Sequence, residues 1–189
     1  MTIPCLLLPG WLNSGPDHWQ SRWQRLRPSL QRVDFGEWVQ PDPQAWSERL
    51  RTAVSGCPTP PLLIAHSLGC LAAAGLVADG DPPPLAGALL VAPPDPARAG
   101  TPAAIADFSP APRDPFRTRG LVVYSSNDPY AEEAFSLSMA EAWGLEPVRI
   151  GALGHINAES GLGDWSEGLA LLDGLLATAR GSAEPLTLA

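Results

Sequence analysis

Apolar and polar residues alternate in blocks along this chain, and the blocks predict strands and helices in turn. Four short runs are apolar almost throughout: Cys5–Leu8, Pro61–Ile64, Leu85–Ala92 and Leu121–Ser125. Such runs are typical of strands that are buried on both faces. Two weaker runs predict further strands, at Gln31–Phe35 and Pro147–Ile150.

Helical spacing of apolar residues fills most of the segments between these strands. Trp19, Trp23 and Leu26 fall on one face of a predicted helix over 17–26. Asp42 and Pro43 predict the start of another, because aspartate caps a helix and proline suits its first position. Small residues at 70–76 favour a third helix, and the remaining helices are predicted at 132–143 and 164–179, with a short one near 102–108.

Strands that alternate with helices predict the α/β class, with a mainly parallel central sheet flanked by helices. We expect one domain over residues 1–180, followed by a poorly ordered tail at 181–189. The 28 residues of Pro93–Gly120 include seven prolines and predict a long, stiff loop. That loop is too short for a separate cap domain.

The turn at Ala65–Gly69 is the most informative motif. It follows a buried strand and precedes the small-residue helix, and its sequence is Ala-His-Ser-Leu-Gly. A strand that turns at once into a helix needs small residues two positions before and after the central serine, as in the G-x-S-x-G nucleophile elbow. Ala65 differs from the usual glycine by one methyl group. Ser67 is therefore the predicted nucleophile.

A serine hydroxyl needs a base, and a histidine base needs a carboxylate to orient it. His155 follows the last predicted strand and Asp128 follows the one before. The chain order Ser67, Asp128, His155 is that of α/β-hydrolases. Asp95, which lies after the strand that follows the elbow, remains a less favoured alternative for the acid. The backbone N–H groups of Trp11 and Leu68 are predicted to form the oxyanion hole.

Several segments resemble the small, lidless serine hydrolases related to retinoblastoma-binding protein 9. The resemblance rests on Pro9–Trp11 with Pro16–Trp19, on the elbow, and on the segments 125–130 and 154–165. It implies a hydrolase with the triad Ser67, Asp128 and His155. The human relative's association with the retinoblastoma protein implies an L-x-C-x-E element, which this sequence lacks, so that partner is not carried over.

The composition of the chain indicates which binding partners and which cellular location to expect. The chain has 12 arginines, no lysine and 20 acidic residues, which give a net charge of −8. An acidic surface disfavours binding to nucleic acid or to anionic membranes. No signal peptide or membrane span is evident, so we expect a cytoplasmic protein. The three cysteines lack metal-ligand spacing, and we expect neither a metal nor an organic cofactor.

The sequence thus predicts a carboxylesterase-like serine hydrolase that cleaves small esters through an acyl-enzyme. A serine peptidase, an amidase or an acyl-transferase would use the same residues. A non-catalytic protein-interaction module is the alternative from another class. The roles of His18, His66 and Glu159 stay open: His66 is favoured as a structural residue, His18 as a packing or pocket residue, and Glu159 as a brace or a solvated side chain.

Overall fold

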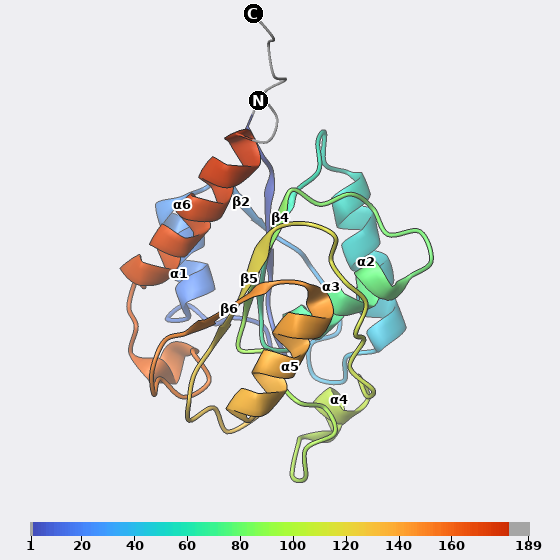
Figure 1. Ribbon diagram of the computed structural model, residues 1–189, viewed down its shortest axis with the longest axis vertical. Coiled ribbons are helices and arrows are strands. Elements are labelled where there is room, and N and C mark those ends of the chain that lie inside the picture. The colour runs from blue at the N-terminus through green and yellow to red at the C-terminus, as the bar shows by residue number, and fades with distance from the viewer. Residues whose placement is uncertain (1, 182–189) are drawn as a thin grey trace, which may run out of the picture.

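The computed structural model describes residues 2–181, which form one six-stranded sheet with helices on both faces (Figure 1). All neighbouring strands pair in parallel, in the order β2-β1-β3-β4-β5-β6. The strands are β1 (Cys5–Leu8), β2 (Leu30–Arg32), β3 (Leu62–His66), β4 (Gly87–Val91), β5 (Gly120–Tyr124) and β6 (Glu146–Arg149). The predicted single-domain α/β architecture is confirmed, and the sheet is parallel throughout.

The helices divide between the two faces of the sheet. They are α1 (Trp19–Leu26), α2 (Pro43–Ser55), α3 (Leu68–Ala78), α4 (Ala103–Ala106), α5 (Glu133–Trp143) and α6 (Ser166–Gly181). Figure 1 shows α1 and α6 on one face, and α2, α3 and α5 on the other. The predicted tail lies outside the described residues, apart from Gly181 at the end of α6.

Alternate side chains of each inner strand enter two separate cores. Leu7 of β1 joins the core beneath α1 and α6, whereas its neighbours Leu6 and Leu8 join the core beneath α2, α3 and α5. Every residue of β3 and β4 is buried. This burial explains why these strands are apolar throughout, since neither face meets water.

Element boundaries differ from the prediction where a polar group ends or begins an element. The strand β2 stops at Arg32, and the chain then turns at Asp34, whose carboxylate accepts the N–H of Gly36. The helix α1 begins at Trp19 rather than Asp17, because His18 is its cap. Such caps satisfy backbone N–H groups that have no partner within the helix.

The carboxyl ends of the strands meet at one edge of the sheet. In Figure 1 this edge lies at the bottom, near α4. Between β4 and β5 the described chain forms only α4, which is shorter than the helix predicted over 102–108. Ligands of open α/β sheets bind at this edge.

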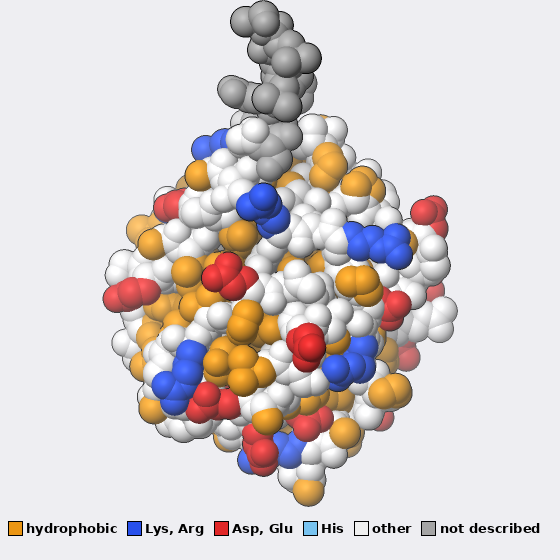
Figure 2. Space-filling view, in the orientation of Figure 1, with side chains coloured by type: hydrophobic (Ala, Val, Ile, Leu, Met, Phe, Trp, Pro, Cys, Tyr) orange, Lys and Arg blue, Asp and Glu red, His pale blue; other side chains and the backbone are white. Residues whose placement is uncertain are grey.

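Charged side chains are interspersed on the face shown in Figure 2. Several of the arginines pair with acids: Arg27 with Asp173, which links α1 to α6, and Arg149 with Glu133. Exposed pairs of this kind stabilise a fold by about 0–1 kcal/mol each.

Gly69 sets how closely α3 approaches β1. A Cβ at this position would collide with the backbone oxygens of Leu8 and Pro9 at the end of that strand. Gly75 lies on the same helix, and a Cβ there would meet nothing within 4 Å.

We expect Gly69→Ala to lower the free energy of unfolding by about 1–3 kcal/mol, the usual cost of overpacking. Gly75→Ala, the matched control, should raise it by about 0.5–1 kcal/mol, because alanine is the better helix former. Urea unfolding of both variants measures the difference. Equal stabilities would contradict the proposed role of the close contact.

Candidate active site

Ser67 occupies a strained backbone turn between β3 and α3. Its φ and ψ are 53° and −125°, in a region that residues other than glycine rarely adopt. Ala65, two positions earlier, is fully buried, so the methyl group that replaces the usual glycine fits. Gly10 packs on the other side, where a Cβ would lie 2.7 Å from the Cβ of Ser67. The predicted elbow is therefore present in the structure.

Three strand ends bring Ser67, His155 and Asp128 together. Nε2 of His155 lies 2.7 Å from Oγ of Ser67, and Nδ1 lies 2.9 and 3.0 Å from the two carboxylate oxygens of Asp128. All three side chains are at least nine-tenths buried. A histidine held in this way can take a proton from the serine while the carboxylate stabilises the resulting imidazolium.

Asp95, the alternative acid, has different partners. Its carboxylate accepts the backbone N–H of Ala97, and its own N–H donates to the carbonyl of Tyr130. Asp128 accepts the N–H of Tyr130 as well as the imidazole of His155, which fixes its orientation. Of the two aspartates, the structure brings only Asp128 to the histidine.

Two polar residues that precede Asp128 anchor the loop that carries His155. Oγ of Ser125 accepts the N–H of Leu153 at 2.8 Å, and Oδ1 of Asn127 accepts the N–H of Gly154 at 2.7 Å. Ser125 also donates to Asn127, which joins the two acceptors. The sequence analysis missed this anchor. Its signal was a pair of small polar residues directly after a buried strand.

Two aromatic side chains hold the same loop from the opposite side. Trp19 of α1 donates its indole N–H to the carbonyl of Ile156, and His66 donates from Nε2 to the carbonyl of His155 at 2.9 Å. Because a carbonyl can only accept, Nε2 of His66 carries the proton. Burial, followed by the nearby His18 and His155, lowers the pKa of His66 well below its usual value.

His18 is a helix cap that also lines the pocket in front of Ser67. Its Nδ1 accepts the backbone N–H of Gln20 at 3.1 Å, so the proton of the neutral ring lies on Nε2. Burial, followed by the charges of Arg32 and His155, lowers the pKa of His18 to about 3. Both His18 and His66 are therefore neutral near pH 7.

The predicted oxyanion groups are free to bind. Neither the backbone N–H of Trp11 nor that of Leu68 has an acceptor within residues 2–181. Leu68 opens α3, and Trp11 follows Gly10, which packs on Ser67. The indole of Trp11 donates to the carbonyl of Val39, which ties the first loop to the loop after β2.

A pocket of about 310 Å³ opens in front of these groups. Its wall combines the apolar side chains of Trp11, Leu12, Ile105 and Tyr130 with polar groups and the three histidines. The ring of Tyr130 packs edge-on against His155, with centroids 4.5 Å apart. Glu159 also lines this pocket and its side chain is exposed, so it lies at the rim.

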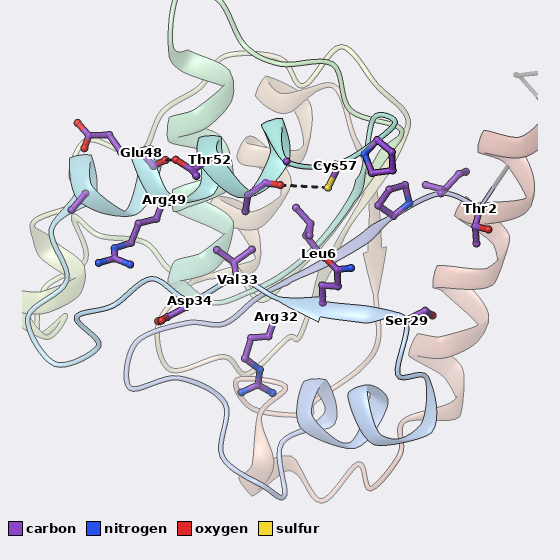
Figure 3. A pocket seen from close by; sticks show the side chains of 17 residues that line it. Thr2, Leu6, Ser29, Arg32, Val33, Asp34, Glu48, Arg49, Thr52 and Cys57 are labelled. Carbon is purple, nitrogen blue, oxygen red and sulfur yellow. Dashed lines mark hydrogen bonds between the residues drawn. The ribbon is translucent and has the colours of Figure 1, made fainter.

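A larger hollow than this pocket lies elsewhere in the described chain. It has a volume of about 1000 Å³ and lies between β2, the N-terminal segment and α2 (Figure 3). Glu48, Arg49 and Asp34 lie along one side, while Arg32 points away from them toward α1. Its lining holds no serine–histidine pair, whereas the smaller pocket at the strand ends is lined by Ser67 and His155.

No helix within residues 2–181 has the length and apolar character needed to cross a membrane. No group of three or more histidine, cysteine, aspartate or glutamate side chains in the same range could hold a metal ion.

Comparison with known proteins identifies the family. A family model described as serine hydrolase matches residues 5–174. The chain belongs to the serine hydrolase family. A search of curated proteins finds no significant match.

Several solved structures are similar to this hydrolase. A protein from Pectobacterium atrosepticum described as a YdeN-like hydrolase is 37% identical, with 94% of this chain and 92% of that chain covered and a TM-score of 0.83. The ydeN gene product of B. subtilis is 19% identical, with 93% and 100% covered and a TM-score of 0.74. Est1E from Butyrivibrio proteoclasticus, solved with ferulic acid, is 13% identical, with 95% and 89% covered and a TM-score of 0.66. The last two likenesses concern the fold alone.

The neutral, buried His18 predicts a loss of stability in acid. The unfolded chain binds a proton at this histidine below about pH 6.5, whereas the folded protein binds it only near pH 3. The unfolded state therefore binds more protons as the pH falls through this window, and the free energy of unfolding decreases.

We expect His18→Asn to reduce this pH dependence, since asparagine can still cap α1 but does not titrate. Between pH 6 and 4, the free energy of unfolding should change less steeply with pH in His18→Asn than in the wild type. The difference in slope should be about 1.4 kcal/mol per pH unit, the value for one proton. Urea unfolding at several pH values measures it. Parallel curves for the two proteins would show that His18 is not the titrating group.

Proposed function

We propose that this serine hydrolase is a carboxylesterase-like enzyme that cleaves small esters through an acyl-enzyme. Ser67 is the nucleophile, His155 the general base and acid, and Asp128 the residue that orients His155. The backbone N–H groups of Trp11 and Leu68 stabilise the oxyanion. None of these steps is assigned to a metal or an organic cofactor.

The reaction follows from the hydrogen bonds of these groups. As Oγ of Ser67 attacks the ester carbonyl, its proton passes to Nε2 of His155, which lies 2.7 Å away. Asp128, bonded to Nδ1, stabilises the imidazolium. The imidazolium then protonates the departing alkoxide, and the carbonyl re-forms to leave an acyl group on Ser67. Water, deprotonated by His155, releases the acid and restores Ser67.

The observation that carries this proposal is the continuous hydrogen-bonded chain from Ser67 through His155 to Asp128. Each member comes from a different strand end, and each is buried. Buried polar groups are costly unless they are paired, and a strained serine adds to that cost. Catalysis accounts for both the burial and the strain, whereas a protein-interaction module would need neither.

Small esters suit the dimensions of the site. The pocket of about 310 Å³ lies at the low end of the volumes typical of ligand sites. The chain between β4 and β5 holds only α4 within the described residues, so no cap encloses a long acyl chain. Peptide, amide and acyl-transfer reactions would share the acyl-enzyme and differ in the leaving group or the acceptor. We also propose kinship with the hydrolases related to retinoblastoma-binding protein 9, on the segments quoted above.

We expect Ser67→Ala to abolish both labelling by a fluorophosphonate probe and hydrolysis of p-nitrophenyl esters, because within residues 2–181 no other serine is hydrogen-bonded to the ring of His155. Ser126→Ala is the matched control, since no hydrogen bond of its side chain is seen in the described chain. The control should keep both activities. Labelling that persists in Ser67→Ala would place the nucleophile elsewhere.

The two candidate acids are distinguished by a pair of isosteric changes. We expect Asp128→Asn to keep the fold but lower kcat by up to about 10⁴-fold, the loss known for a comparable triad, because His155 loses the carboxylate that fixes its tautomer. Asp95→Asn should stay within a few-fold of the wild type. Turnover of one p-nitrophenyl ester by both variants tests this, and the reverse ranking would transfer the role to Asp95.

A further inference from the structure

The Nε2–H group of His18 has no hydrogen-bond partner within the described chain, although the atom is almost fully covered. The side chain is 5% exposed. Since Nδ1 accepts the N–H of Gln20, the free nitrogen is the protonated one, a donor without an acceptor. A buried donor left without a partner destabilises a fold, so it calls for a reason.

Capping of α1 does not supply that reason. Asparagine, aspartate or serine at position 18 would accept the same N–H of Gln20, and these residues are preferred as helix caps. Serine has no second polar group, and the second polar group of aspartate or asparagine lies closer to the backbone than Nε2 of histidine. Capping therefore does not explain the polar atom at Nε2.

The position of the ring supplies a functional reason. His18 lines the same pocket as Ser67 and His155. The ring is held between Trp19 and His66, whose centroids lie 5.3 and 4.6 Å away, so its orientation is fixed. Its Nδ1 edge faces the helix, which leaves the Nε2 edge for another partner. With the pKa lowered to about 3, the ring stays a neutral donor at any pH at which the enzyme would act.

We propose that His18 is a substrate-recognition residue, whose Nε2–H donates a hydrogen bond to a second oxygen of the substrate, beside the ester that Ser67 attacks. The preferred substrates are therefore esters that carry an ether, hydroxyl or carbonyl oxygen close to the scissile bond, rather than plain alkyl esters. This inference rests on the proposed esterase function. Because Nε2 is almost fully covered, binding includes a small outward shift of the pocket wall beside His18.

Two pairs of isosteric esters test the inference from both sides of the scissile bond. p-Nitrophenyl butyrate and methoxyacetate differ by one oxygen in the acyl part, and butyl and 2-methoxyethyl acetate differ by one oxygen in the alcohol part. For each pair, we take the ratio of kcat/KM for the oxygenated ester to kcat/KM for the alkyl ester. This ratio is then compared between the wild type and the His18 variants. Differences in intrinsic reactivity cancel in this comparison.

The variants are His18→Asn, which keeps a cap acceptor, and His18→Phe, which keeps the volume of the ring. Both lack the Nε2–H donor. In at least one pair of esters we expect the ratio to fall about tenfold in both variants, as for the loss of one neutral hydrogen bond. An unchanged ratio for both pairs would overturn the inference. An equal loss of activity on all four esters leaves the ratios unchanged, so it would overturn the inference as well.

A binding measurement keeps the test independent of turnover and of how well the His18 variants fold. In the Ser67→Ala protein, titration with methyl methoxyacetate should shift the imidazole ¹⁵N resonance of Nε2 of His18, whereas methyl butyrate should shift it less. Equal shifts, or none, would overturn the inference. Failure of the proposed function looks different: the wild type and Ser67→Ala would then hydrolyse every ester equally slowly.

Discussion

The structure depends on one constraint, the left-handed backbone turn at Ser67 between β3 and α3. The strand can turn into the helix so abruptly only if nothing larger than hydrogen projects from Gly69 toward the end of β1, or from Gly10 toward the serine. These contacts bring the first loop, Ser67 and the start of α3 together. The same arrangement sets the positions of the backbone N–H groups of Trp11 and Leu68.

The histidine is positioned by elements that are distant in the sequence. Its side chain is bonded to Asp128, and its loop is bonded to Ser125 and Asn127 after β5, to His66 at the end of β3 and to Trp19 in α1. These bonds hold the loop from both sides, so the imidazole is aligned with the serine before any substrate arrives. Alignment of this kind lowers the reorganisation that catalysis requires.

The pocket contains three histidines in different roles. His155 bonds both to the serine and to a carboxylate, whereas His18 and His66 have no acidic partner in the described part of the chain and are kept neutral by burial. Burial lowers the pKa of both His18 and His66, and the cost of protonating them appears as instability in acid.

Much of the fold and the arrangement of the candidate site could be predicted from the sequence, because those features follow from local patterns. Uninterrupted apolar runs indicated buried parallel strands, and the small residues around Ser67 indicated the elbow, since both patterns reflect steric and solvation limits on nearby residues. The order of residues along the chain suggested Asp128 as the acid and His155 as the base. The ends of helices and strands were less certain, because a side-chain contact decides whether a residue such as His18 caps a helix.

Only the tertiary structure decided between residues for which the sequence indicated a preference alone. Asp128 and Asp95 both follow strands, but only Asp128 reaches the histidine, because the loop after β5 bends back toward the loop after β6. His66 and His18 acquire their roles from a carbonyl 89 residues away and from a pocket wall formed by several loops. These contacts depend on how separate elements pack, and residue spacing along the chain carries no record of that packing.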